Sequence, residues 1–145
     1  MAKAIERAVQ NFGVSWESQY GYVQASQHGD TIYLSGQLSH RGEELFAPAP
    51  LDSSGSVTDF SNMGAQMRQS YVNAAELLRR FDASLDNVIE EVIYVLDMDA
   101  AYAIAGPVRK EAYGREDPQV ASTILVTPRL SFPPQLVEIK FVARL

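Results

Sequence analysis

Apolar residues recur at spacings of three and four between residues 59 and 81, and this periodicity predicts the longest helix of the chain. The apolar stripe consists of Met63, Met67, Tyr71, Ala74, Leu78 and Phe81. A second helix is predicted over residues 100–113, because Asp97 and Asp99 can cap its first turn. Gly106-Pro107 is expected to kink or end this helix, since proline lacks the amide hydrogen and clashes with the preceding turn.

Runs of β-branched and aromatic residues predict the strands. Residues 20–26 and 31–35 flank a polar break at Gly29, and this arrangement predicts a hairpin. Further strands are expected at residues 88–96, 119–126 and 135–143. Before the hairpin, residues 4–9 allow a short helical turn that Gly13 ends.

The order of these elements predicts an α+β fold in a single domain spanning residues 1–145, with one mixed β-sheet covered on one face by two helices. The connection at residues 39–57 is long and polar, and residues 44–47 are its only candidate strand. Trp16 is expected to anchor the packing of the N-terminal segment. Apolar residues occur on both sides of the central strands, so a homo-oligomer is expected in which another subunit covers the free face.

Composition narrows the class of protein. A chain of 145 residues with 46% hydrophobic and 21% charged residues is typical of a globular domain. The absence of cysteine excludes disulfides, thiolate zinc sites and cysteine nucleophiles. His28 and His40 lie in separate polar segments without metal-ligand spacing, so surface positions are expected for both and no metal site is expected.

The charge and hydropathy of the chain indicate which partners and which cellular location to expect. The formal net charge is −6 and basic residues form only short pairs, so nucleic acid is not expected as a partner. No apolar run approaches the roughly 18 residues that a membrane helix needs. Residues 1–7 lack the apolar core of a signal peptide. We therefore expect no membrane association and a cytoplasmic location.

The clearest candidate for chemistry is the strand at residues 31–38, which ends in Ser35-Gly36-Gln37. Glycine there permits close backbone approach, and polar groups at the end of a buried strand often build small-molecule sites. The chain contains no nucleophile elbow, phosphate loop, dinucleotide fingerprint or His-Glu-x-x-His motif. A strand followed by an ordinary turn is the alternative interpretation.

Glu138 is the most informative polar residue, because it interrupts the apolar strand Leu136-Val137-Glu138-Ile139. An inward carboxylate costs stability unless it is paired or hydrogen-bonded. Strand alternation can instead place Glu138 on a solvated face. The other polar candidates on strands are Tyr22, Ser122 and Thr123.

Several short segments occur in an order and spacing that are typical of one protein family. They are Tyr22-Val23-Gln24, Gly29-Asp30, Ser35-Gly36-Gln37, Gln66, Arg68-Gln69-Ser70, Asn73, Val95-Leu96-Asp97-Met98, Pro118, Ser122-Thr123 and Val137-Glu138-Ile139. On these segments the chain resembles the RidA/YjgF family of reactive-intermediate (enamine/imine) deaminases, some of which carry the label L-PSP endoribonuclease. The resemblance runs from about residue 21 to residue 143.

The resemblance implies a chorismate-mutase-like fold, a homotrimer, and clefts between subunits where small enamines and imines are hydrolysed with release of ammonia and without a cofactor. Tyr22 would form a wall of the cleft, Ser35, Gly36 and Gln37 would line its floor, and Glu138 would position the water. The catalytic residues implied are Glu138, Gln37 and Tyr22. The substrate-binding residues implied are Ser35, Gly36, Ser122 and Thr123. A carboxylate that orients water and takes a proton suffices for general-base catalysis.

The sequence departs from the family at Ala121. Members that deaminate amino-acid-derived imines carry an arginine there, which binds the substrate carboxylate through paired bonds that alanine cannot replace. An asparagine of the family's second helix corresponds to Ala105. Arg129, a few residues further on, is a candidate replacement for the missing guanidinium.

Three functions remain open. The first is a deaminase that acts on an imine, enamine or related carbonyl compound with altered substrate preference. The second is a non-catalytic trimer that binds a small metabolite and has a regulatory role, which Ala121 and Ala105 favour because both remove polar groups from the implied site. The third is a ribonuclease, which the acidic charge and the lack of a histidine pair argue against.

Overall fold

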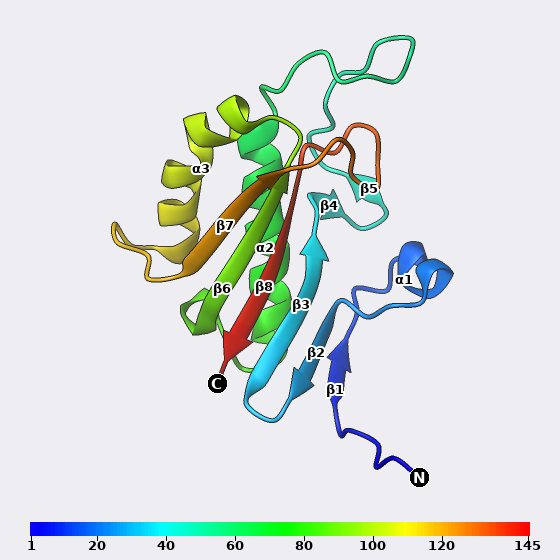
Figure 1. Cartoon of the computed structure of the whole chain (residues 1–145), viewed down its shortest axis with the longest axis vertical. Coiled ribbons are helices and arrows are strands. Elements are labelled where there is room, and N and C mark those ends of the chain that lie inside the picture. The colour runs from blue at the N-terminus through cyan, green and yellow to red at the C-terminus, as the bar shows by residue number, and fades with distance from the viewer.

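A six-stranded mixed β-sheet forms the centre of the molecule in the computed structural model, which describes all 145 residues (Figure 1). In spatial order the strands are β1 (Ala8–Gln10), β2 (Ala25–His28), β3 (Thr31–Gln37), β8 (Val137–Arg144), β6 (Val88–Val95) and β7 (Ala121–Val126). Only β6 and β7 are parallel, and a helix crosses over between them, as parallel neighbours require. All other neighbouring strands are antiparallel.

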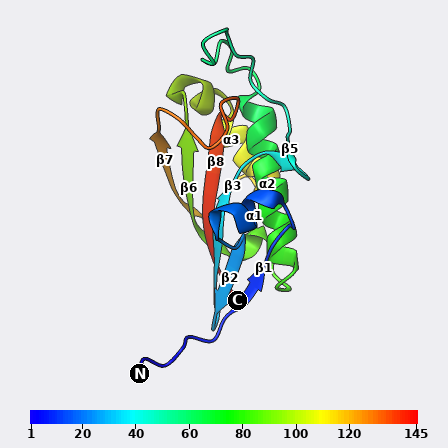
Figure 2. The same cartoon turned by 90° about the vertical axis from the view of Figure 1, so that its right-hand side faces the viewer.

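Two helices, α2 (Met63–Arg79) and α3 (Met98–Tyr113), cover one face of the sheet, and the opposite face is free within one chain (Figure 2). The remaining elements are α1 (Ser15–Tyr20), β4 (His40–Arg41), β5 (Glu44–Leu45) and the 3-10 turn η1 (Leu85–Asn87). The α+β fold predicted from the sequence is therefore confirmed. No helix combines the length and the apolar character that a bilayer-spanning segment needs.

The hydrophobic core lies between the sheet and α2. Alternate residues of β8, Val137, Ile139 and Phe141, are fully buried, as are Ile32 and Leu34 of β3. They meet the buried stripe of α2, which consists of Met63, Met67, Tyr71, Ala74, Leu77 and Leu78. Each large side chain buried in this way contributes about 1.5–3 kcal/mol.

A buried amide on α2 holds two distant loops. Nε2 of Gln66 donates to the carbonyl oxygens of Ala47 at 2.9 Å and Pro134 at 3.0 Å. Its Oε1 accepts from the backbone amide of Leu136 at 2.8 Å. Because buried backbone groups need partners, this single side chain fixes the long connection after β5 beside the segment that enters β8.

Helix α3 begins as predicted, because the side chain of Asp97 accepts a hydrogen bond from the amide of Ala100 at 2.8 Å. A kink or an early end was predicted at Gly106-Pro107, and the early end is wrong, since the helix continues to Tyr113 with Pro107 inside it. Pro107 lies on the exposed side, so water can reach the carbonyl that loses its partner. Its neighbours Ala105 and Val108 are buried and keep the helix packed on the core.

The predicted helical turn at residues 4–9 is also wrong. Residues Ala8–Gln10 form β1, which pairs antiparallel with β2 and extends the sheet by one edge strand. The ladder supplies partners for backbone groups that a short isolated helical turn would leave to water. A helix appears later instead, at Ser15–Tyr20.

The free face of the sheet carries apolar side chains at its centre. Tyr33, Val92, Tyr94 and Val142 alternate with buried residues and so point away from the helices. Tyr33 remains 48% exposed. Glu138 and Lys140 of β8 lie on the same face, beside Tyr94 and Val92. Exposed apolar side chains such as these are typical of an interaction site.

Glu91 is a fully buried carboxylate between the sheet and the helices. One oxygen accepts from the hydroxyls of Tyr71 at 2.8 Å and Tyr113 at 2.9 Å, and the other from Nε of Arg109 at 2.6 Å and Oγ of Ser122 at 2.9 Å. Burial and the adjacent carboxylate raise the pKa of Tyr71 and of Tyr113, so both hydroxyls stay protonated and donate. Glu91 thereby joins β6, β7, α2 and α3.

Replacing Glu91 by alanine should lower the free energy of unfolding by about 3–5 kcal/mol, because it leaves Arg109 without its partner in a desolvated site. Urea denaturation would measure the loss. Glu111→Ala is the matched control, since it removes an exposed ion pair with Arg68 and should cost no more than about 1 kcal/mol. Equal losses in the two variants would contradict the assigned role of Glu91.

Candidate functional site

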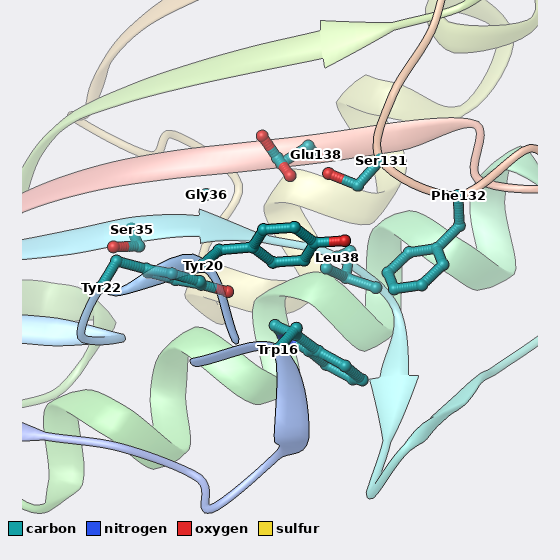
Figure 3. Close-up of a pocket in the computed structure, with 9 residues that line it drawn as sticks. All are labelled: Trp16, Tyr20, Tyr22, Ser35, Gly36, Leu38, Ser131, Phe132 and Glu138. Carbon is teal, nitrogen blue, oxygen red and sulfur yellow. The ribbon is translucent and has the colours of Figure 1, made fainter. Parts of the chain in front are cut away.

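A cavity of about 540 Å³ lies where the end of β3 meets the start of β8 (Figure 3). Its lining residues come from four segments: Trp16, Tyr20 and Tyr22; Ser35, Gly36 and Leu38; Ser131 and Phe132; and Glu138. Figure 3 shows the carboxylate of Glu138 on one side and the rings of Trp16, Tyr20 and Tyr22 on the other. This volume is within the range of small-molecule sites.

The position of α1, and with it one wall of the cavity, is fixed by Glu17. Its buried carboxylate accepts hydrogen bonds from three successive backbone amides, at residues 12–14, over 2.9–3.1 Å. Ser15 donates from both its amide and its hydroxyl to Glu43, each at 2.7 Å. These bonds hold the first turn of α1 against the preceding residues 12–14 and against the β4–β5 hairpin. Trp16, in this turn, is thereby held at the cavity.

Gly21 ends α1 and turns the chain at the cavity mouth. Its φ of 74° is in the left-handed region, and its amide bonds to the carbonyl of Glu17 at 3.0 Å. This conformation favours glycine because it has no Cβ. The reversal allows both flanking tyrosines to line the cavity, with Tyr20 71% exposed and Tyr22 further inside.

A β-bulge at Ser35–Gly36 shapes the floor of the cavity. The paired residues on either side of it are Leu34 with Phe141 and Gln37 with Ile139. Three steps along β3 thus face two steps along β8, and the extra residue changes which face the following side chain occupies. As a result Ser35 and Gly36 both line the cavity, whereas Gln37 turns into the interior.

Gln37 therefore does not lie on the cavity floor, where it was expected from the sequence. It is 1% exposed, and its Nε2 donates to Oε1 of Gln24 at 3.0 Å and to the carbonyl of Ser35 at 2.9 Å. Nε2 of Gln24 in turn lies 3.5 Å from the hydroxyl of Tyr22. Gln37 is linked to the cavity through these neighbours rather than by direct contact.

Glu138 lies directly across Gly36. A Cβ at residue 36 would fall 2.5 Å from Cδ and Oε2 of the carboxylate, so only glycine leaves room for it. Burial raises the pKa of Glu138, and the side-chain amide of Gln135 partly opposes this shift. Glu138 is thus neither on a fully solvated face nor in the core, and a half-buried carboxyl of this kind is a candidate acid or base.

Tyr22 and Ser35 contribute hydroxyls to the polar lining, as do Tyr20 and Ser131. Burial, together with the carboxylates of Glu17 and Glu138, raises the pKa of Tyr22, so its hydroxyl stays protonated at neutral pH and can donate to a ligand. Oγ of Ser35 donates to the carbonyl of Val23 at 2.7 Å. This bond uses the only proton of Ser35 and leaves its oxygen as an acceptor.

The other expected site residues lie elsewhere within one chain. Ala121 and Thr123 are on the free face of β7, which is separated from β8 by β6. Ser122 points to the opposite face and bonds to Glu91. Arg129 lines a different cavity, of about 440 Å³, beside the loop at residues 54–57. The structure therefore brings together Tyr22, Ser35, Gly36 and Glu138. Within one chain, the residues of β7 and Arg129 do not join them.

Several lining residues were not singled out as functional from the sequence. They are Tyr20, Leu38, Ser131 and Phe132, together with Trp16, which was expected only as a packing anchor. The two tyrosines of Tyr20-Gly21-Tyr22 form a local sequence pattern that could have pointed to the site. Ser131 and Phe132 lie in a proline-rich loop that has no such pattern. The carbonyl of Leu38 is held by Nδ2 of Asn73 at 3.0 Å.

The surface position expected for His40 is wrong. It is 4% exposed and lies between the rings of Phe12 and Trp16, at centroid distances of 5.0 and 5.3 Å. Burial lowers the pKa of His40, so the neutral form of the imidazole is favoured where it packs against Trp16. The structure contains no cluster of side chains suited to hold a metal ion.

Comparison with known families identifies the chain. Residues 12–145 match the family described as Endoribonuclease L-PSP. The chain belongs to this family, the RidA/YjgF family. The resemblance seen in the sequence is thus confirmed for nearly the whole chain.

Solved structures share the fold of this RidA/YjgF protein. Rv2704 from Mycobacterium tuberculosis, described as a member of the YjgF/YER057c/UK114 family, has a TM-score of 0.76 and 22% identity over 97% of this chain and 100% of that one. The protein YJGH has a TM-score of 0.73 and 24% identity, covering 95% of both chains. Yeast Mmf1 has a TM-score of 0.72 and 16% identity over 96% of this chain and 98% of its own.

The raised pKa of Glu138 predicts a pH-dependent stability effect. The folded protein holds the carboxyl proton more tightly than the unfolded chain, so ionisation costs stability as the pH rises from the unfolded to the folded pKa. Glu138→Gln should therefore unfold at a higher temperature than the parent at about pH 8, and the difference should vanish towards about pH 4. Thermal unfolding across this range would measure it, and a pH-independent difference would contradict the assignment.

Proposed function

We propose that this protein is a cofactor-independent hydrolase that converts a small imine, enamine or related compound to a carbonyl product and ammonia. The observation that supports this most is the carboxyl of Glu138, held across Gly36 in a small-molecule cavity with a raised pKa. A base whose pKa is moved towards neutral pH is well suited to activate water. Membership of the RidA/YjgF family supports the same class of reaction.

The reaction needs only water and one group that carries a proton. An enamine first tautomerises to the imine, whose nitrogen takes up a proton from the solvent. Glu138 takes a proton from water as the water oxygen bonds to the imine carbon and the C=N π electrons move to nitrogen. The proton then returns from Glu138 to the nitrogen, and the C–N bond breaks. The hydroxyl proton passes to the departing ammonia, which leaves carbonyl compound and ammonium as products.

The neighbouring residues have distinct roles in this proposal. The protonated hydroxyl of Tyr22 donates to the substrate or to the attacking water, and the oxygen of Ser35 accepts. Gln37 is a positioning residue, because it reaches the cavity only through Gln24 and the carbonyl of Ser35. It supports the bulge rather than contacting the substrate.

We further propose a homotrimer in which a neighbouring subunit completes the site. The free face of the sheet carries the apolar side chains of Tyr33, Val92, Tyr94 and Val142, and Ala121 and Thr123 point to this side. They do not line the cavity of their own chain, and β6 separates their strand from β8, so in this proposal they act at a neighbour's cavity. Ala121 offers no charge to a substrate carboxylate, and Arg129 is the remaining candidate in the loop that follows β7.

A second candidate function is a non-catalytic trimer that binds a small metabolite and regulates another process. This alternative is favoured by the cavity lining, which contains no lysine, arginine or histidine to hold a substrate carboxylate. Saturable binding without turnover would distinguish it from the hydrolase. We do not propose RNA cleavage, because neither His28 nor His40 lines the cavity that contains Glu138.

The direct test of the hydrolase is ammonia release from 2-aminoacrylate generated in situ and from carboxylate-free imines. The parent protein should accelerate release from at least one carboxylate-free imine, and Glu138→Gln should reduce this rate by about 100-fold or more, since the base is lost. Glu111→Gln on the surface of α3 is the control and should keep the parent rate. A Glu138→Gln variant with full activity would disprove the role of Glu138.

The proposed contribution of the neighbouring subunit predicts a gain of function. Ala121→Arg should raise the rate with 2-aminoacrylate by about tenfold relative to carboxylate-free imines, because a guanidinium can pair with the substrate carboxylate. Ala121→Leu, which adds bulk without charge, should not. Both ratios would come from kcat/KM measured by ammonia release. An unchanged ratio in Ala121→Arg would contradict the placement of Ala121 in the site.

A further inference from the structure

The charge of the cavity is unusual for a site that would receive a carboxylate. Its lining contains one acidic side chain, Glu138, and no basic one. Lys140 is on the same side of β8, two residues away, but it does not line the cavity and makes no ion pair. Among the residues of one chain, a carboxylate bound here would lie near Glu138 without a cation in the lining to neutralise it, and an unpaired charge out of water is costly.

The rest of the lining is strongly aromatic. Trp16, Tyr20, Tyr22 and Phe132 supply four rings to one cavity. The rings of Trp16 and Phe132 meet edge to face, with centroids 5.6 Å apart and planes at 70°. Tyr20 and Tyr22 flank the turn at Gly21, and both side chains are seen in Figure 3. Aromatic faces attract cations, and they do so most strongly where water is excluded.

We propose that this cavity selects a small organic cation, an ammonium or iminium with apolar substituents and no carboxylate. Glu138 provides the opposite charge and the four rings contact the apolar substituents, with Tyr20 on the solvent-exposed side of the cavity. The inference rests on the proposed function in that both use this cavity. If the protein is a hydrolase, its substrate binds as the protonated imine, with the C=N group beside Glu138, which then accepts the proton of the attacking water.

The intrinsic fluorescence of Trp16 can be used to measure binding in this cavity. Trp16 is the only tryptophan and it lines the cavity, so a change in intrinsic fluorescence reports occupancy directly. Three probes of nearly equal shape separate charge from size: choline, its neutral analogue 3,3-dimethylbutan-1-ol, and the anion 3,3-dimethylbutanoate. None contains a C=N bond, so the measurement does not depend on turnover. Calorimetric titration of the same probes gives an independent affinity.

Choline should bind about tenfold more tightly than the neutral alcohol, and the anion should bind most weakly. Glu138→Gln should reduce the affinity for choline towards that of the alcohol and leave the affinity for the alcohol unchanged. Tyr20→Leu should weaken choline binding several-fold. Tyr102→Leu, an equally exposed tyrosine on α3 outside the cavity, is the matched control and should not.

Equal affinities for choline and the alcohol, or no binding of choline, would overturn the inference. Tightest binding of the anion would overturn it too, and loss of that binding in Lys140→Met would show that Lys140 holds carboxylates. The outcome is separable from the proposed function. Choline binding without hydrolysis of any imine keeps the inference and rejects the hydrolase, whereas hydrolysis without a preference for choline does the reverse.

Discussion

The β-bulge in β3 is the constraint on which the candidate site depends. Without the extra residue, strand alternation would carry Gln37 to the same side as Ser35 and would turn Gly36 towards the core. The bulge instead places Ser35 and Gly36 together beside β8 and moves a polar amide inside. Because Gly36 has no Cβ, the carboxylate of Glu138 can lie across the backbone at this point.

Buried polar side chains hold the walls around this bulge. Glu17 fixes α1, Asn73 holds the carbonyl at Leu38, and Gln66 ties the loop before β8 to α2. Each of these groups is satisfied by backbone partners, so its burial positions a loop instead of destabilising the core. Glu91 lies on the helix-covered face of the sheet as well, but it accepts only from side chains and joins both long helices to β7.

The chemistry of the cavity follows from its combination of a carboxylate with aromatic rings. Removal from water moves the pKa of Glu138 upwards, and a cationic ligand would favour the ionised form again. Binding of a cation is thus coupled to the release of a proton from this side chain. The same coupling suits a hydrolase, in which the carboxylate takes a proton from water, and a binding protein, in which it only neutralises a cation. The two candidate functions differ in what happens after binding, not in what the cavity recognises.

Local patterns in the sequence determined the long helix, the main strands, the α+β class and the candidates Ser35, Gly36 and Glu138. These signals are local because side-chain periodicity follows backbone geometry. Only the tertiary structure decided that Gln37 turns inward, that Phe132 meets Trp16, and that His40 is buried. Such features depend on strand register and on contacts between segments far apart in the chain. A local sequence pattern does not contain this information. The aromatic lining of the cavity could therefore be recognised only in the folded structure.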